Sequence, residues 1–159
     1  MTTRSELDAL DARILLAMDD EPSASALALA RRLGVARNTV HARLQKLERR
    51  GALAAPSRRL TPAAFGYHLT AFVDVELSQA QAAAAYAALA AIPEIVEVHS
   101  TTGDADLMLK VMARDTRDLR RITELLLAAP GVQRTSTTVS LGEVVAYRVD
   151  GVLRRLAEG

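Results

Sequence analysis

Residues 31–59 read RRLGVARNTVHARLQKLERRGALAAPSRR. This stretch carries nine basic residues and a single acid, Glu48, in a chain of 159 residues whose net charge is only +1. Its pattern indicates a short helix that ends at Gly34, a tight turn, and a longer helix that ends at Gly51. Two helices joined by a tight turn, with positive charge concentrated on them, are typical of a helix-turn-helix that binds duplex DNA. The stretch therefore predicts a DNA-binding module.

The longer of the two helices is predicted over residues 37–50 and has two distinct faces. Val40, Leu44 and Leu47 recur at the i, i+4, i+7 spacing of a stripe that faces a core. At about 100° per residue, the opposite face holds the side chains that can read base edges, namely Asn38, His41 and Gln45. Arg43 lies nearer the stripe, so we expect it to bind a phosphate or to form an ion pair within the protein. The candidate DNA-binding residues are Arg37, Asn38, Thr39, His41, Gln45, Lys46 and Arg49.

Before this pair of helices, apolar residues recur at helical spacing from Leu7 to Met18 and predict a first helix. Ser5, followed by Asp8 three residues later, is typical of a capping box with Asp in place of Glu. The short helix is expected to begin at Ser25 and to end at Gly34, which suits the positive φ of a helix end. The first half is therefore predicted to be a three-helix module. A basic helix face that is merely solvated is the alternative that helical charge alone leaves open.

Beyond residue 66, the hydrophobic period changes from helical to alternating, which is typical of strands. Two segments still favour helix, an Ala-rich run over residues 78–92 and an amphipathic run over residues 116–129. The expected strands cover residues 70–77, 95–102, 107–113 and 132–145. The order βαββαβ predicts an α+β domain of the ferredoxin-like type, in which both helices cover one face of an antiparallel sheet.

Composition and charge bound the remaining possibilities. Half of the residues are apolar, which suffices for a core, and the absence of cysteine excludes disulfides, thiol nucleophiles and thiolate metal sites. Residues 1–60 carry 11 basic and 7 acidic residues, whereas residues 61–159 carry 9 and 12. This asymmetry predicts a basic DNA-binding module followed by a second module. The run Pro-Ser-Arg-Arg-Leu-Thr-Pro breaks the helical period and places a linker over residues 56–66, between a DNA-binding domain over 1–55 and a second domain over 67–159. No signal peptide or membrane span is recognisable, so we expect a cytoplasmic protein that does not contact membranes.

No constellation of residues suggests an enzyme. The three histidines, His41, His68 and His99, fall on unrelated elements. Neither a glycine-rich phosphate loop nor a metal-ligand spacing occurs. We therefore expect no catalytic residues, no metal and no cofactor.

Short motifs spread over almost the whole chain resemble those of the Lrp/AsnC family of bacterial and archaeal transcription regulators. In the first half and the linker, the matching residues are Leu7, Asp8, Asp11, Ile14, Leu15, Leu29, Ala30, Thr39, Val40, Arg43, Leu47, Glu48, Gly51, Leu60, Pro62 and Gly66. In the second half they are Thr102, Gly103, Asp104, Asp106, Pro130, Gly131, Val132, Arg134, Thr135, Thr137 and Leu141. The resemblance implies an N-terminal winged helix-turn-helix and a C-terminal βαββαβ domain for ligand sensing and oligomerisation.

Members of this family sense a small effector, usually an amino acid, where the C-terminal domains of neighbouring dimers meet. The residues that match the family's effector site are Gly103, Asp104, Ala105, Asp106, Thr135 and Thr137. Loop amides suit a carboxylate, an aspartate suits an ammonium, and two strand hydroxyls complete a polar pocket. By itself, however, Gly-Asp-x-Asp between two strands is typical of a hairpin turn. The implied partners are double-stranded DNA, an amino-acid effector, and further copies of the chain as a homodimer that builds higher oligomers such as octamers.

Two residues depart from the family's pattern. Ala105 stands where the family often has tyrosine, which bears on the size and polarity of the effector, and Ala36 stands where it often has a serine that caps the recognition helix. The implied function is sequence-specific regulation of transcription in response to an effector. Two alternatives stay open: an architectural protein that organises DNA without an effector, and an enzyme like the sirohaem decarboxylases, which share the two-part architecture.

Overall fold

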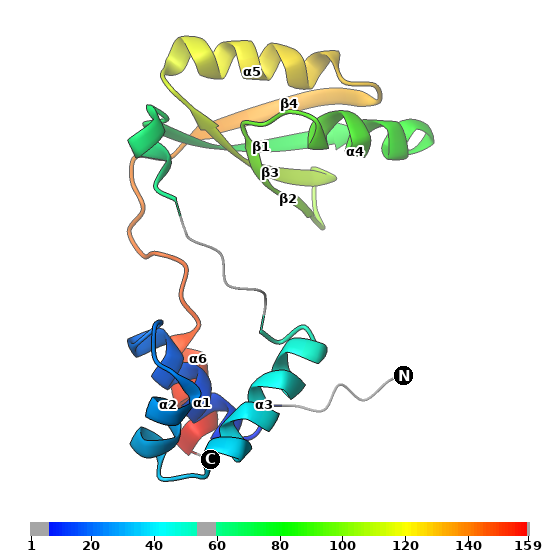
Figure 1. Ribbon diagram of the computed structural model, residues 1–159. Coiled ribbons are helices and arrows are strands. Elements are labelled where there is room, and N and C mark those ends of the chain that lie inside the picture. The colour runs from blue at the N-terminus through cyan, green and yellow to red at the C-terminus, as the bar shows by residue number, and fades with distance from the viewer. Residues whose placement is uncertain (1–6, 54–59, 159) are drawn as a thin grey trace. The chain divides into compact units, whose positions relative to one another are not determined.

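The computed structural model describes residues 7–53 and 60–158 (Figure 1). The chain divides into two compact units. Of the described residues, unit 1 holds 7–53 together with 145–158, and unit 2 holds 60–144. The polypeptide therefore passes from one unit to the other twice.

Three helices of unit 1 form the predicted helix-turn-helix and its supporting helix: α1 (Ala9–Asp20), α2 (Ala26–Leu33) and α3 (Arg37–Arg49). The apolar stripe of each helix is buried against the others through Ile14, Leu29, Val40 and Leu47. α2 ends at Gly34, which adopts the left-handed conformation with φ 69°. The tight turn and the bounds of α2 and α3 confirm the prediction from residues 31–51.

The N-terminus of α1 differs from the prediction. Asp8 accepts a hydrogen bond from the N–H of Asp11 at 2.9 Å, and Asp11 accepts one from the N–H of Asp8 at 3.3 Å. The capping box therefore joins Asp8 to Asp11, and Asp8 is not the second member of a box that begins at Ser5. Ser5 itself lies outside the described residues. At the start of α3, Ala36 makes no side-chain capping bond, as expected from the loss of a serine there.

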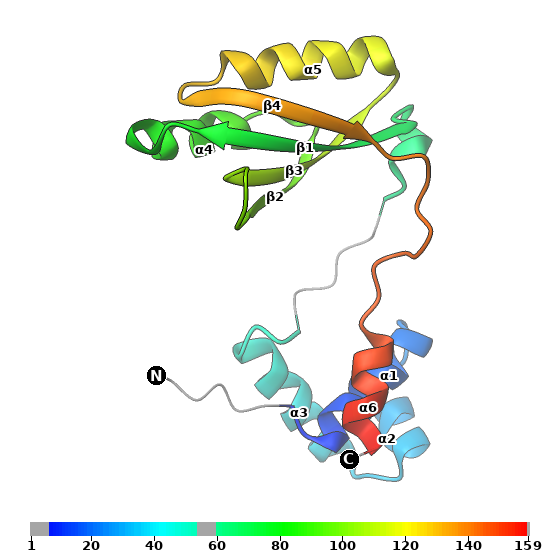
Figure 2. The ribbon, with the colours of Figure 1, turned by 180° about the vertical axis from the view of Figure 1, so that it is seen from behind.

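A fourth helix of unit 1, α6 (Asp150–Glu158), is absent from the prediction. It packs along α1, and both helices lie side by side in Figure 1 and Figure 2. The sequence interpretation assigned residues 67–159 to one domain, but the structure groups residues 145–158 with the N-terminal helices. An isolated helix of nine residues is unstable in water. The apolar side of α6 is instead stabilised by the surface of α1.

Unit 2 is an antiparallel sheet of four strands in the order β2-β3-β1-β4, and α4 and α5 cover one face of it. The elements are β1 (Leu69–Leu77), α4 (Ala82–Ala90), β2 (Ile95–Ser100), β3 (Leu107–Ala113), α5 (Thr116–Ala128) and β4 (Val132–Val139). Short 3-10 helices, η1 (Pro62–Phe65) and η2 (Gln79–Gln81), precede β1 and α4. This arrangement confirms the predicted α+β fold.

β4 is shorter than predicted, because it ends at Val139 rather than at residue 145. β4 is an edge strand whose only neighbour is β1, and β1 begins at Leu69. The last bond between them runs from the N–H of Ser140 to the carbonyl of Thr70 at 2.9 Å. Further backbone groups of a strand have nothing to pair with once the partner strand ends. Strand propensity alone cannot supply that partner.

The two faces of the sheet differ in chemistry. Val73, Val75, Leu109 and Val111 alternate toward the helices and form the core with residues of α4 and α5. The other side carries polar and large apolar side chains, and no described helix covers it. We call this side the open face, and its residues are Thr70, Phe72, Asp74, Glu76, Glu97, His99, Met108, Lys110, Met112, Arg134, Ser136 and Thr138.

The turn between α5 and β4 requires glycine. Gly131 has φ 79°, and a Cβ added there would lie 2.8 Å from the Cβ of Gln81. Its carbonyl accepts a hydrogen bond from the N–H of Ser78 at 2.8 Å. A side chain at this position would strain the backbone and separate the two loops. Gly131 therefore holds the start of β4 against the end of β1.

Candidate nucleic-acid interface and ligand loop

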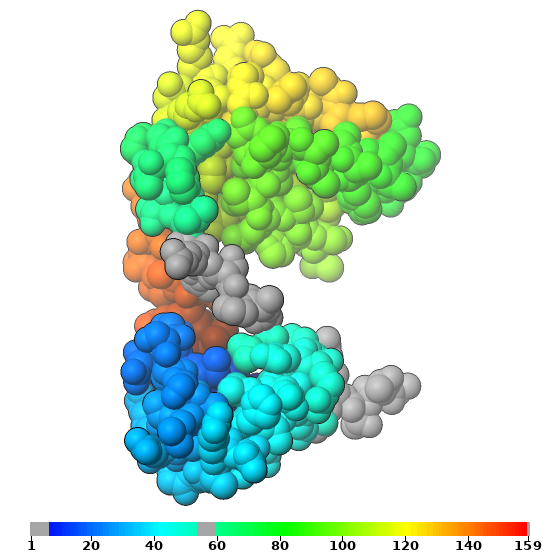
Figure 3. All heavy atoms as spheres, in the orientation of Figure 1, coloured from blue at the N-terminus to red at the C-terminus, as the bar shows by residue number. Residues whose placement is uncertain are grey.

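The predicted base-reading face of α3 lies at the surface. Arg37, Asn38, His41, Gln45 and Arg49 are exposed, whereas Thr39 and Lys46 are half-buried. This difference follows from the helical period, because the buried stripe of α3 occupies the other side. α2 packs against α3, and the atoms of both helices lie together on the surface of unit 1 in Figure 3.

Two of these exposed side chains contact each other. Nε2 of Gln45 lies 3.1 Å from Nε2 of His41, one helical turn earlier. The amide nitrogen of Gln45 donates in this contact and the ring nitrogen of His41 accepts. The contact orients the Gln45 amide along the surface of α3. Sequence spacing places the two residues on one face but does not reveal this bond.

Arg43 turns away from that face and binds α1. Its Nη1 lies 3.0 Å from Oδ1 of Asp11, and the same nitrogen donates to Asp8. Asp11 is 1% exposed and is the one buried charged residue in the described ranges. The carboxylates of Asp8 and Asp11 raise the pKa of Arg43. The N–H of Asp11, and then Arg43, lower the pKa of Asp8. Of the two roles expected for Arg43, the structure supports the internal ion pair.

The cations of the basic stretch therefore fall into two groups. Arg32 pairs with Asp20, and Arg43 pairs with Asp8 and Asp11. Arg58 and Arg59 lie outside the described residues. The cations that form no ion pair within the described part of the chain are Arg31, Arg37, Lys46, Arg49 and Arg50. Among the described cations of this stretch, these five have a charge that is free to neutralise phosphates without first breaking an ion pair.

The loop between β2 and β3 contains the second set of predicted site residues, and Asp106 anchors it. The Asp106 carboxylate accepts from the N–H of Leu77 at 2.7 Å and from Nε2 of Gln79 at 2.9 Å. Its own N–H donates to the carbonyl of Val75 at 3.0 Å. Thr101 closes the loop by donating to the carbonyl of Ala105 at 2.8 Å. Both carboxylate oxygens of Asp106 are thus used to hold the loop to the end of β1.

Asp104 differs from Asp106 in its exposure and in its hydrogen bonding. It is exposed, and no hydrogen bond or ion pair joins it to another residue in the described ranges. Gly103, also exposed, has φ 128°, a conformation that side-chain-bearing residues rarely adopt. Ala105 is half-buried. The tip of the loop therefore presents a carboxylate without a protein partner beside an accessible backbone.

The strand register brings Thr135 to the same end of the sheet as this loop. Thr135 pairs with Val75, whose partner on its other side is Leu107, the residue that follows Asp106. Thr137 pairs with Val73 one step further along, and both threonines point to the helix-covered side of β4. Thr135 is half-buried and Thr137 is exposed. The predicted effector residues therefore gather around the end of β1, with Thr137 the furthest from the loop.

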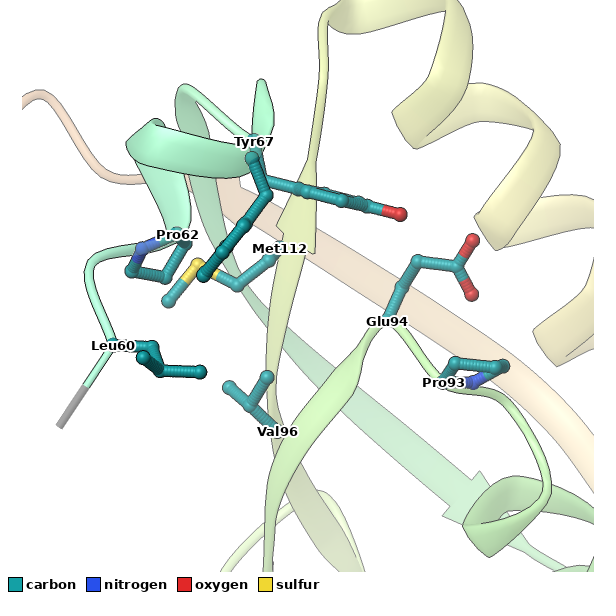
Figure 4. A pocket seen from close by; sticks show the side chains of 8 residues that line it. Leu60, Pro62, Tyr67, Pro93, Glu94, Val96 and Met112 are labelled. Carbon is teal, nitrogen blue, oxygen red and sulfur yellow. The ribbon is translucent and has the colours of Figure 1, made fainter. Parts of the chain in front are cut away.

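An apolar hollow that the sequence did not suggest lies toward the opposite end of the sheet (Figure 4). Its volume is about 250 Å³, and it is lined by Leu60, Pro62, Phe65, Tyr67, Pro93, Glu94, Val96 and Met112. Met112 pairs with Thr70 near the start of β1, whereas Asp106 binds the end of that strand. The guanidinium of Arg114 lies 5.5 Å from the centre of the Tyr67 ring. The hollow thus includes none of the predicted effector residues.

Residues 7–53 and 60–158 contain no group of three or more His, Cys, Asp or Glu side chains placed to hold a metal ion. Among the same residues, no helix combines the length and hydropathy that a transmembrane span needs.

Two family models match the chain. Residues 7–53 match a winged helix-turn-helix DNA-binding domain, and residues 70–150 match the Lrp/AsnC ligand binding domain. Among curated relatives, the HTH-type transcriptional regulator FL11 of Pyrococcus horikoshii is 31% identical over 87% of this chain and 91% of its own. The HTH-type transcriptional regulator AldR of Mycolicibacterium smegmatis is 35% identical over 84% of this chain and 81% of its own.

Solved structures show the same similarity. E. coli AsnC superposes with a TM-score of 0.84 at 26% identity and covers 91% of this chain and 99% of its own. A feast or famine regulatory protein from M. tuberculosis, complexed with L-methionine, superposes with a TM-score of 0.81 at 29% identity and covers 91% and 98%. Both the fold and the sequence of these proteins therefore resemble the present chain along nearly its whole length.

Proposed function

The chain belongs to the Lrp/AsnC family of transcription regulators, and from this premise we propose that it binds operator DNA sequence-specifically, with an affinity that responds to an amino acid. Like its relatives, it is a regulator and not an enzyme. Because the proposed target is chromosomal DNA, we propose that it acts in the cytoplasm.

Operator recognition is proposed to rest on α3. Asn38, His41 and Gln45 are exposed on one face and have the amide and imidazole groups that pair with base edges. Arg37 and Arg49 on the same face, with Lys46 and Thr39 beside it, are the proposed phosphate contacts. The ion pairing of the cations on α3 supports this proposal. Arg43 is paired with residues of α1, whereas Arg37, Lys46 and Arg49 form no ion pair within the described residues.

Effector binding is proposed at the tip of the β2–β3 loop. The observation that carries this proposal is the contrast between Asp104, which has no protein partner in the described ranges, and Asp106, whose carboxylate is fully used. Asp104 suits the ammonium of an amino acid, and the backbone beside Gly103 suits its carboxylate. Asp106 then supports the loop, Ala105 leaves room where the family often has tyrosine, and the hydroxyls of Thr135 and Thr137 face the ligand's polar groups. The M. tuberculosis relative that was crystallised with L-methionine supports an amino acid as the class of ligand.

Assembly is proposed to begin with a dimer that buries the open face. Phe72 and Met108 are 40% and 36% exposed there, so a second copy that covered this face would bury apolar surface at its centre. Around this surface, Glu97 pairs with Lys110 at 3.1 Å and with His99 at 3.3 Å. A two-fold axis would place the same surface of each copy against the other. Higher oligomers would then bring the ligand loops of neighbouring dimers together, as in the family.

The proposal is tested by a thermal-shift screen of the twenty amino acids, followed by DNA binding with and without the best one. A ligand present at about a hundred times its Kd should stabilise the protein by about 2.7 kcal/mol. The same ligand should change the affinity for a duplex selected from a random pool by more than it changes affinity for random DNA. Stabilisation by no amino acid, together with tight DNA binding, would instead favour the architectural alternative.

A further inference from the structure

We propose that α6 is a positioning element for DNA recognition, through which the last residues of the chain determine how α3 presents its base-reading face. The proposal rests on the DNA-binding part of the proposed function and assigns a role to a helix that makes no predicted DNA contact. It follows from a chain of contacts that leads from α6 to α1 and from α1 to α3.

The first link is the packing of α6 on α1 (Figure 2). Leu153 and Ala157, four residues apart on one side of α6, are half-buried. Val152 and Leu156, on the adjoining side, are 55% and 41% exposed. α6 therefore uses one strip of its apolar surface against unit 1 and leaves the neighbouring strip in solvent. Leu153 is the side chain on which the contact with α1 depends most, because it is the largest on the covered strip.

The second link joins α1 to α3. Asp8 and Asp11, at the start of α1, hold the guanidinium of Arg43 from two carboxylates. Arg43 lies two residues before Gln45 on α3. This contact, together with the packing of α2 on α3, sets the rotation of α3 about its axis and hence the direction of His41 and Gln45. A displacement or tilt of α1 would consequently rotate the base-reading face.

A covalent connection leads into this chain of contacts from unit 2. α6 follows β4 directly through residues 140–149, a segment without helix or strand. β4 is an edge strand that pairs with β1 and packs under α5, and it carries Thr135 and Thr137 of the proposed effector site. This segment is a covalent route from β4 to α6 that does not involve the linker before β1.

The test compares three variants of the full chain, Leu153→Ser, Leu153→Met and Val152→Ser. The first removes the apolar contact with α1, the second keeps it, and the third makes a similar loss of apolar surface on the exposed strip. Binding is measured to a duplex selected from a random pool and to random-sequence duplex of the same length. The decisive quantity is the ratio of the two affinities. A smaller folded fraction lowers both affinities equally and leaves their ratio unchanged, whereas a misplaced α3 lowers the ratio.

We expect Leu153→Ser to lower this ratio about tenfold, which corresponds to about 1.4 kcal/mol of discrimination. Leu153→Met and Val152→Ser should keep the parent's ratio. An unchanged ratio for Leu153→Ser, whether its affinities fall together or not at all, would overturn the inference. An equal loss of ratio in Val152→Ser would also overturn it, because the effect would not depend on the α1 contact. A parent without sequence preference would contradict the proposed function itself.

Discussion

The guanidinium of Arg43 on α3 lies 3.0 Å from the buried carboxylate of Asp11 on α1. This contact joins the recognition helix to its supporting helix across 32 residues of sequence. Removal of one member of a buried ion pair leaves the other as an uncompensated charge. We therefore expect the contact to stabilise unit 1 and to help set the rotation of α3.

Arg43→Met should destabilise unit 1 by about 3 kcal/mol, because the Asp11 carboxylate would lose its cationic partner in a buried position. Arg32→Met is the matched control, since the Arg32–Asp20 pair is about half exposed and should contribute less than about 1 kcal/mol. Urea unfolding followed by circular dichroism measures both changes. Equally small losses in the two variants would show that the Asp11 contact adds nothing beyond a surface ion pair.

The stability of unit 1 should fall at acid pH in a way that depends on Asp8. The N–H of Asp11, followed by the guanidinium of Arg43, holds the pKa of Asp8 below its ordinary value of 3.8. A carboxyl with a depressed pKa contributes stability that is complete above the unfolded value and is lost as the pH falls through the folded value. Urea unfolding at a series of pH values below about 5 should show this loss in the parent. Asp8→Asn should have a lower free energy of unfolding than the parent near neutrality, and that free energy should depend less on pH. A pH profile parallel to that of the parent would contradict this.

Gln45→Ala and Lys46→Ala should separate base reading from phosphate binding. Loss of the Gln45 amide should cost about 1–3 kcal/mol on the selected operator and little on random DNA. Loss of the Lys46 charge should weaken both duplexes similarly and reduce the salt dependence by about one unit per protomer. Titrations over a range of salt concentrations measure both effects. Equal losses on both duplexes for Gln45→Ala would remove it from the base-reading set.

Asp104→Ala and Asp106→Ala should differ in their effect on stability. Asp104 has no partner among the described residues, so its loss should change stability by less than about 0.5 kcal/mol and abolish the response to the amino acid. Asp106 holds Leu77 and Gln79, so its loss should destabilise unit 2 by about 1–3 kcal/mol. Thr135→Val should weaken binding while keeping the fold. Calorimetry and thermal unfolding measure these outcomes, and full affinity in both Asp104→Ala and Thr135→Val would place the effector elsewhere.

Phe72→Glu should convert the proposed dimer to a monomer, because it places a charge at the centre of the open face. Tyr86→Glu is the matched control, since Tyr86 is similarly exposed but lies on α4, on the helix side of the sheet. Light scattering at micromolar concentration gives the mass of each variant. A Phe72→Glu protein that keeps the mass of the parent would exclude the open face as the dimer contact.

Local patterns in the sequence were sufficient to predict most of the helices and strands. Turn residues such as Gly34 and the apolar stripe of Val40, Leu44 and Leu47 act within a few residues of themselves, so their meaning does not depend on the fold. Local patterns did not predict where β4 ends or that α6 forms. The length of an edge strand depends on where its partner begins, and a short helix such as α6 exists only because a distant surface accepts it.

The same distinction applies to the proposed sites. Residue types and spacing determined the candidates on α3, from Arg37 to Arg49, whereas the resemblance to the family supplied those of the loop, from Gly103 to Asp106. Only the tertiary structure decided how they differ, because Arg43 is neutralised by Asp11 and Asp106 is used by Leu77 and Gln79, all supplied by other elements. The sequence gives the charge of each side chain directly, because the charge follows from the residue type. Whether that charge is free for DNA or a ligand depends on which residues, remote in sequence, lie within hydrogen-bonding distance.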